Sequence, residues 1–316
     1  MQDLIESSTL TKKIKSLCIN AGFSAVGVSK AEIITDESDY FLTWLSEGRN
    51  AGMEWLKTTY HQRINPFKIF PEVKSIISLA YIYNTPFKHK EQKNIPKISK
   101  HAWGNVDYHK VIKRILKELC IKINFLVKNQ TNKTITTVYF VDTAPIMEKY
   151  WAIKSGVGWR GKNTIVINPQ FGSFFFIGTI FLNLELEYDT AIDNICNECD
   201  ICLKSCPTGA LYNEYNLDAN RCISYHTIEN KNEIPDNINL HNWIYGCDIC
   251  QNVCPYNNVK KTIYSQNKDF NPKNKFFNKS KDLYLNVTEE EFHNEFSNSP
   301  LSRLKFQNWI RNLRRI

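Results

Sequence analysis

Eight of the ten cysteines of this chain lie between positions 196 and 254 at spacings that are typical of iron–sulfur ligands. Residues 196–207 read C-x2-C-x2-C-x3-C-P, and residues 247–255 read C-x2-C-x3-C-P. In two-cluster ferredoxins, the cysteine of each Cys-Pro pair binds the other cluster. The pattern therefore predicts two [4Fe–4S] clusters, one held by Cys196, Cys199, Cys202 and Cys254 and the other by Cys206, Cys222, Cys247 and Cys250.

Zinc sites and disulfides are the two alternative uses of these cysteines. A zinc site explains paired C-x2-C units but neither the third cysteine at the same spacing nor the two Cys-Pro pairs. Disulfides are rare in cytosolic chains. The remaining Cys18 and Cys120 fall on the apolar faces of predicted helices, so we expect them to be buried core residues.

Upstream of the cysteines, Asp142 ends a β-branched and aromatic run, residues 134–141, and precedes Pro145. Catalytic groups often lie at such strand ends, and a partly buried carboxyl there could donate a proton. An aspartate in this position is equally typical of a helix N-cap. The pattern leaves both interpretations open.

Two further segments carry polar groups beside glycines or aromatics. Residues 156–163, GVGWRGKN, nearly match a phosphate-binding loop, but Asn163 replaces the required Ser or Thr, and a helix precedes where a strand is needed. The turn could hold an anion or a cofactor's amides, or simply end a helix. Residues 103–109, WGNVDYH, include Asp107, which could cap the next helix, and His109, a residue that is more often structural than a ligand at such a place.

The elements that must position these groups alternate between helices and strands. Ile14, Leu17, Cys18 and Ala21 predict a helix that Gly22 closes, and residues 73–81 predict a buried strand. Residues 84–100 read as a loop. Further predictions are a helix over 107–119, a strand over 134–141, a helix from Pro145 to about 155 ended by Gly156, a hairpin of residues 164–168 and 173–183, and a C-terminal helix from Pro300.

The charge balance favours a polyanionic partner, because the chain carries a formal net charge of +8. Basic residues gather between positions 63 and 100 and again from Arg303 to Ile316, where Phe306 and Trp309 are interleaved with them. This pattern suits nucleic acid, although charge alone favours the simpler explanation of a solvated basic surface. No apolar run is long enough for a membrane helix, and the N-terminus does not resemble a signal peptide. We therefore expect a cytoplasmic protein without a membrane contact.

Taken together, the cysteine framework and the segments VDTAP (141–145), GWRGKN (158–163) and DYH (107–109) resemble epoxyqueuosine reductase. The resemblance runs from about residue 10 to the last residue. It implies an α+β chain with a mixed α/β cobalamin-binding catalytic domain over residues 1–190, a ferredoxin-like two-cluster domain over 191–260, and a helical C-terminal segment over 261–316 that contacts tRNA.

The resemblance also implies the chemistry. Family members reduce epoxyqueuosine to queuosine at the wobble position of tRNA, with electrons passing from the clusters to cobalamin and on to the epoxide. Asp142 matches the family's proton donor. The residues implied to line the corrin or the substrate are Asn105, Asp107, Tyr108, His109, Asp142, Trp159, Arg160, Lys162, Asn163 and Ser224.

Several partners and alternatives follow from this comparison. We expect an external electron donor such as a flavodoxin or ferredoxin, the anticodon loop of tRNA as substrate, and a monomer. Many members of the family continue with a helical-repeat tail that this chain lacks, so the grip on tRNA is expected to be smaller or to rely on the basic C-terminal helix. The alternatives are a reductive dehalogenase-like enzyme acting on a small molecule, and a non-enzymatic ferredoxin-type electron carrier.

Overall fold

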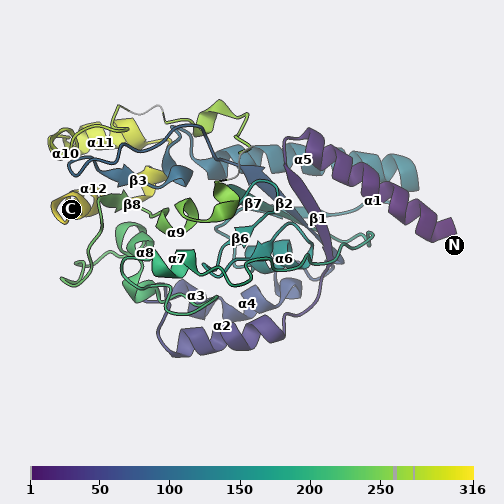
Figure 1. Cartoon of the computed structure of the whole chain (residues 1–316). Coiled ribbons are helices and arrows are strands. Elements are labelled where there is room, and N and C mark those ends of the chain that lie inside the picture. The colour runs from purple at the N-terminus through teal and green to yellow at the C-terminus, as the bar shows by residue number, and fades with distance from the viewer. Residues whose placement is uncertain (1, 259–261, 273–274) are drawn as a thin grey trace.

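A four-stranded antiparallel sheet forms the centre of the computed structural model, which describes residues 2–258, 262–272 and 275–316, with side chains from residue 8 onward. Its strands follow the order β1-β2-β7-β4 (Figure 1). The bounds are β1 Ala25–Lys30, β2 Ser75–Ile82, β7 Phe175–Leu182 and β4 Thr137–Phe140. The expected mixture of helices and strands is thus confirmed, as is the buried strand near residues 73–81.

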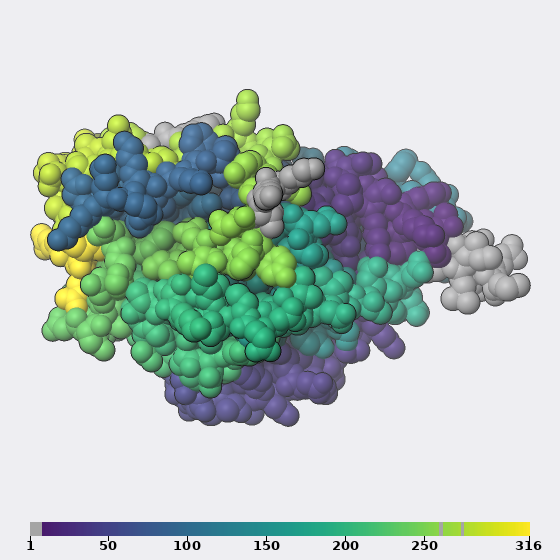
Figure 2. Space-filling model, in the orientation of Figure 1, coloured from purple at the N-terminus to yellow at the C-terminus, as the bar shows by residue number. Residues whose placement is uncertain are grey.

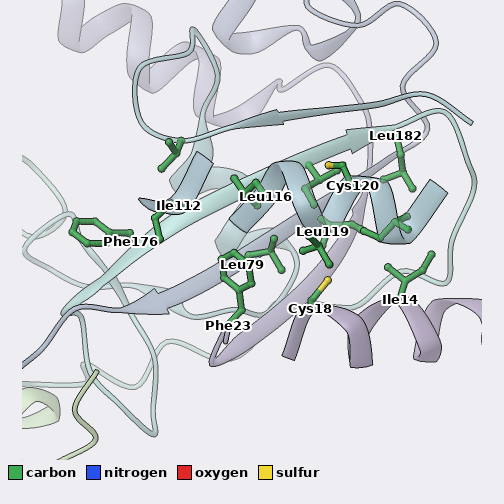
Figure 3. Packing of buried hydrophobic residues seen from close by; sticks show 14 of the residues in the cluster. Ile14, Cys18, Phe23, Leu79, Ile112, Leu116, Leu119, Cys120, Phe176 and Leu182 are labelled. Atoms are coloured by element: carbon green, nitrogen blue, oxygen red, sulfur yellow. The ribbon is translucent and has the colours of Figure 1, made fainter. Parts of the chain in front are cut away.

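Helices α1 (Gln2–Asn20) and α5 (Tyr108–Thr131) cover one face of this sheet. Figure 3 shows their apolar side chains meeting those of the strands, with Cys18 and Cys120 among them. Both cysteines are buried, which confirms the prediction that they are core residues. Helix α5 begins where Asp107 accepts a hydrogen bond from the backbone N–H of His109, and it extends 12 residues beyond the predicted end at Leu119.

Helix α6 (Glu148–Lys154) covers the opposite face, held very close to β1. Gly27 makes this approach possible, since a Cβ atom there would lie 2.1 Å from the backbone oxygen of Ser155. Helix α6 was predicted to begin at Pro145, and this is wrong. Residues 142–147 form irregular backbone, and Gly156 closes the helix as predicted with a φ of +72°.

A layer of short helices lies beyond α6, at the bottom of Figure 1. These helices are α2 (Asp36–Ser46), α3 (Trp55–Thr58) and α4 (Tyr60–Ile64), followed by the 3-10 turn η1 (Pro66–Lys68). Phe41 of α2 stacks on Trp44 and Tyr60. The layer thereby presents aromatic side chains toward the rest of the molecule.

The segment after β7 is composed of short elements that surround the cysteines. They are α7 (Ile201–Lys204), η3 (Ala219–Arg221), α8 (Ile223–Ile228), β8 (Trp243–Tyr245), α9 (Ile249–Asn252) and η4 (Pro255–Asn257). Before β7, β5 (Trp159–Arg160) pairs with β6 (Val166–Ile167). The predicted hairpin of β6 with β7 is wrong, because β7 pairs with β2 and β4, and only Asn168 and Gly172 bridge the two runs.

The C-terminal segment builds a second core of its own with distant parts of the chain. Its elements are η5 (Lys268–Phe270), α10 (Lys281–Leu285), α11 (Glu289–Phe296), η6 (Pro300–Arg303) and α12 (Phe306–Arg314). Phe276, Phe292 and Trp309 pack there against Trp103, which follows the 3-10 turn η2 (Lys100–Ala102), and against Tyr245 of β8. Residues 84–100 were predicted as a loop, yet β3 (Lys97–Ile98) pairs in parallel with β8. Figure 2 shows this blue segment lying beside the yellow-green C-terminal one.

This core limits what the C-terminal helix offers to a nucleic acid. Trp309 is fully buried, so its ring is not available to stack on a base. The Arg311 guanidinium donates hydrogen bonds to the backbone oxygens of His226, Asn230 and Asn232. Of the two arginines on α12, Arg311 therefore serves the fold, and Arg314 is the exposed one that can face a partner. No helix in the described part of the chain has the length and apolar character that crossing a membrane requires.

Candidate active site

The cysteines converge in two groups, which we name set I and set II. Cys202 lies on α7 and Cys250 lies on α9, two short helices that pack against each other. Burial raises the pKa of the Cys254 thiol, and the nearby Cys196 and Cys199 raise it further. Burial likewise raises the pKa of Cys250, with further contributions from Cys247, Cys222 and Cys206. Set I thus contains Cys196, Cys199, Cys202 and Cys254, and set II contains Cys206, Cys222, Cys247 and Cys250.

The thiols of set I surround a space that suits a cluster. A cavity of about 390 Å³ opens among the four thiols of set I. Within the described residues, no three His, Cys, Asp or Glu side chains converge tightly enough to hold one metal ion. Thiols that are close enough to influence one another, yet spread around a cavity, suit a four-iron cubane.

Four of the sequence-predicted residues lie against these cysteine loops. The Trp159 indole N–H points at the Sγ atom of Cys196 at 3.4 Å, and Lys162 donates to the backbone oxygen of Asn197 at 2.6 Å. The Asn163 amide donates to the backbone oxygen of Cys250 at 3.4 Å. The backbone of Ser224 hydrogen-bonds to the thiol of Cys222. In this structure these residues brace the loops that carry the thiols.

Two adjoining cavities lie near set II, because Lys149, which lines both, interacts electrostatically with Cys250. The main cavity, about 610 Å³, has an aromatic wall from the α2–α4 layer that includes Tyr40, Trp44 and Trp55. Its polar wall includes Arg160, Glu229 and Arg303, together with Arg63 from α4. The inner cavity, about 170 Å³, reaches Tyr108 of α5 and Phe176 near the start of β7. Asp142, Glu148 and Lys149 line both cavities, so the segment that carries them divides one from the other.

Asp142 follows β4 in a tight turn at this division. Its φ is +59°, a left-handed conformation that is unusual for a residue with a side chain, and the N–H of Thr143 bonds to the oxygen of Val141 at 2.7 Å. The Asp142 carboxylate accepts hydrogen bonds from the Tyr108 hydroxyl and, at 3.2 Å, from Nε2 of His109. More than half of the side chain, 57%, remains exposed, so the carboxylate can meet a bound substrate.

A chain of proton carriers runs inward from Asp142. Nδ1 of His109 lies 2.7 Å from Oδ1 of Asp107, which places the ring between two carboxylates. Burial disfavours the charged ring, but the hydrogen bonds to Asp107 and Asp142 outweigh it and raise the pKa of His109. Burial also opposes the charge of Asp142, yet hydrogen bonds from His109 and Tyr108 lower its pKa to about 2. Of the two groups, His109 therefore holds a proton more readily than Asp142.

Glu148, on the first turn of α6, is a site residue that sequence reasoning missed. Its Oε1 atom accepts a hydrogen bond from the backbone N–H of Asp142 at 2.6 Å. Part of its surface faces the cavities, but surrounding protein and the nearby Asp142 carboxylate raise its pKa to about 8. The sequence shows only an acidic residue six positions after Asp142, and an acidic residue there is typical of the first turn of any helix.

Two other predicted residues lie at the edges of the site. Arg160 lines the main cavity and forms an ion pair with Glu37 at 2.5 Å. Asn105 is half-buried in the turn before Asp107. The structure thus gathers Asp107, Tyr108, His109 and Asp142 into one network, and it places Trp159, Lys162, Asn163 and Ser224 with the cysteines instead.

Comparison with known proteins identifies the two halves of this arrangement. Residues 63–143 match the family model described as "Epoxyqueuosine reductase QueG, DUF1730", and residues 195–257 match a "4Fe-4S double cluster binding domain". The chain is 38% identical over 310 residues to an epoxyqueuosine reductase of Atelocyanobacterium thalassa, covering 96% of this chain and 98% of that one.

The chain belongs to the epoxyqueuosine reductase family. It is an oxidoreductase with a double-cluster [4Fe–4S] domain. A relative from Cyclobacterium marinum is 35% identical and covers 96% of this chain and 95% of its own length. The resemblance predicted from the motifs is thereby confirmed.

Solved structures of the family agree with this fold. One epoxyqueuosine reductase superposes with a TM-score of 0.84 at 27% identity, covering 96% of this chain and 80% of its own. Another, with a TM-score of 0.82, 27% identity and the same coverages, is in complex with an epoxyqueuosine-modified tRNA stem loop. A third, from Bacillus subtilis, is described with its catalytic loop swung out of the active site; its TM-score is 0.85 at 26% identity over the same shares.

Proposed function

We propose that this chain reduces epoxyqueuosine to queuosine at the wobble position of tRNA, with Asp142 as the group that protonates the departing oxygen. The observation that carries this proposal is the Asp142 carboxylate, held between Tyr108 and His109 at the junction of two cavities beside set II. Removing the epoxide oxygen as water consumes two electrons and two protons. The proton chain would supply the protons and the two cysteine sets the electrons.

The eight thiols of sets I and II would hold the two clusters, and the main cavity would hold cobalamin. Its aromatic wall suits an apolar ring system, and its polar wall suits amide side chains. Cobalamin supplies low-valent cobalt chemistry and the clusters supply single electrons. Tyr40, Trp44 and Trp55 would pack on the ring system, while Arg160 and Arg303 would face its polar rim. Electrons would enter at set I, because Cys199 is exposed, and leave from set II.

The chain's own residues would manage the proton. At rest His109 carries it and Asp142 is a carboxylate. A substrate that fills the cavity displaces water from Asp142, which raises the pKa of that carboxyl and draws the proton from His109. Asp142 then donates to the oxygen as the carbon–oxygen bond breaks. Asp107 fixes the ring of His109 throughout.

The proposal extends to partners and setting. The stem-loop complex of a relative supports an anticodon loop as substrate, and the net charge of +8 suits that polyanion. We assign residues 1–190 to the catalytic domain, 191–260 to the cluster domain and 261–316 to a C-terminal segment. A flavodoxin or ferredoxin would supply electrons to a cytoplasmic monomer. Residues 142–147 would correspond to the mobile catalytic loop of the Bacillus subtilis relative.

Two measurements test this proposal. Anaerobic reconstitution should yield about eight irons per chain, and one cobalt, with bound cobalamin visible in the absorption and EPR spectra. Clusters without retained cobalt would favour the electron-carrier alternative. Conversion of a modified RNA stem loop, inhibited by salt, would exclude a small-molecule reductase.

The Asp142→Asn variant should keep its cofactors and lose about 10²–10⁴-fold in kcat, because the amide cannot donate the proton. Asp282→Asn, an exposed position on α10, is the matched control. Near-normal turnover of Asp142→Asn with full cofactor content would remove Asp142 from the proton-donor role.

A further inference from the structure

We propose that Glu148 is a positioning residue that holds the Asp142 loop, residues 142–147, in its inward conformation. The inference rests on the proposed function only in naming Asp142 as the acid. Its basis is the hydrogen bond from the Asp142 backbone N–H to Oε1 of Glu148, together with the left-handed backbone at Asp142.

The Asp142 loop needs an external hold because its own backbone conformation is unfavourable. A residue with a Cβ atom resists the left-handed region, and Asp142 also lies at the centre of a three-residue turn. Such conformations persist only where surrounding structure enforces them. Released from its contacts, Asp142 would relax toward an ordinary φ and swing its carboxylate away from Tyr108 and His109.

Glu148 is a rigid anchor for this purpose. It begins α6, which Trp151 and Ala152 bury against the sheet and which lies in close contact with β1 at Gly27. Helix α6 lacks a side-chain cap at Met147. The Glu148 carboxyl reaches back instead to Asp142, so the position of the loop is tied to the position of the sheet.

A second contact holds the other end of the loop. The Arg63 guanidinium donates to the backbone oxygen of Ile146 at 3.4 Å and is itself oriented by the Thr59 hydroxyl at 2.9 Å. The loop is thus held at its first and fifth residues, with Thr143 exposed between them. Because Asp142 and Glu148 line both cavities, outward movement of the loop would also join the main and inner cavities.

The protonation state of Glu148 suits a residue that positions the loop by accepting a hydrogen bond, and not one that acts through its charge. A carboxylate so close to ionised Asp142 would repel it, whereas a protonated carboxyl still accepts the N–H through its carbonyl oxygen. Glutamine reproduces that acceptor without the titratable group. Leucine has a similar size and cannot accept a hydrogen bond.

The test compares Glu148→Gln and Glu148→Leu in the reconstituted holoenzyme, with Glu118→Gln on the exposed face of α5 as control. Hydrogen–deuterium exchange of a peptide covering residues 141–147 reports the hold directly, and turnover of a modified RNA stem loop reports its consequence. We expect Leu to speed exchange and lower kcat by about tenfold each, with little change in KM, as loss of one hydrogen bond predicts. Gln should restore both toward wild type.

The outcomes separate the two proposals. If Leu leaves exchange and kcat unchanged, Glu148 does not hold the loop, whatever Asp142 does. If Gln is as impaired as Leu in exchange, the carboxyl group acts through its charge or proton, and the positioning role is overturned. If Asp142→Asn turns over normally while Leu still speeds exchange, the hold stands and the proposed function of Asp142 fails. Iron and cobalt content measured in each variant identifies a general loss of structure.

Discussion

The proton chain at the site is assembled from a pair of neighbours and one distant residue. Asp107 and His109 lie two positions apart at the start of α5, and Asp142 joins them from the end of β4. Asp107 therefore has two roles, because it caps α5 and also fixes the ring of His109. Asp142 itself caps no helix, because the aspartate that caps α5 is Asp107, and the proton-donor role of Asp142 stays a prediction.

His109→Asn tests the proton supply. Asparagine can still donate a hydrogen bond to Asp142 but carries no proton to relay, so kcat should fall by about 10–100-fold. In the wild type, protonated His109 is populated below its raised pKa, and kcat should fall as pH rises through that value. The single-turnover rate measured against pH should lose this limb in the variant.

The free energy of unfolding should change with pH in the same direction as kcat. The raised pKa of His109 means that its ion pairs stabilise the fold fully below the unfolded value of 6.5, and that this contribution is lost as pH rises through the folded value. His293→Asn, an exposed position, should alter neither profile. A pH limb that persists in His109→Asn would assign the titration to another group.

At the scale of single residues, the sequence predicted which side chains belong to the candidate site. Asp142, Tyr108, His109 and the eight cysteines carry recognisable motifs. Glu148 does not, because its role depends on a backbone N–H placed by a left-handed turn, and single residues leave no periodic signal of such a turn. The roles of Lys162 and Asn163 depended likewise on which loop lies beside them.

At the scale of elements, the two cysteine loops depend on each other. Short helices α7 and α9 each carry one thiol, and the cysteine of each Cys-Pro pair lies with the opposite set. Spacing alone suggested this exchange. The positions of the surrounding strands were harder to predict, since β6 and β7 read as a hairpin until pairing with β2 and β4 is known. Pro145 likewise predicted a helix start, but irregular backbone intervenes and α6 begins at Glu148.

This exchange of the two Cys-Pro cysteines between the sets predicts which thiols become open to alkylation when one of them is replaced. Cys206→Ser should impair the cluster of set II, leave about half the iron, and expose Cys222, Cys247 and Cys250 to alkylation. Cys254→Ser should do the same to Cys196, Cys199 and Cys202. Mass spectrometry of the anaerobically alkylated proteins distinguishes the two patterns. If Cys206→Ser instead exposes the set I thiols, each loop binds its own cluster.

At the scale of the whole molecule, the second core packs the C-terminal segment against distant parts of the chain. Trp309 packs with Phe276, Tyr284, Phe292 and Phe296, and this cluster continues to Trp103 and Tyr245. Sequence predicted a C-terminal helix from Pro300 but not this core, because the aromatic residues before that helix are scattered among asparagines and lysines. Partners that lie some 200 residues away in the chain leave no local pattern.

Trp309→Ala should therefore destabilise the protein by about 3–5 kcal/mol, the usual cost of removing a buried indole. Leu283→Ala, 41% exposed on α10, should cost about 0.5 kcal/mol or less. Denaturant unfolding of the holoprotein, followed by near-ultraviolet circular dichroism under anaerobic conditions, measures the difference. Equal midpoints for the two variants would contradict a packed C-terminal core.

The pairing of β2 with β7 has a consequence for how the chain is made. Ser78 lies opposite Thr179, so the central pair closes across about 100 residues and must form slowly. Yet β7 ends at Leu182, before Cys196. During synthesis, the whole sheet can leave the ribosome and fold before the first cluster cysteine emerges. Iron–sulfur assembly would then act on a nascent chain whose scaffold already stands, and its thiols would spend the least time exposed to oxygen.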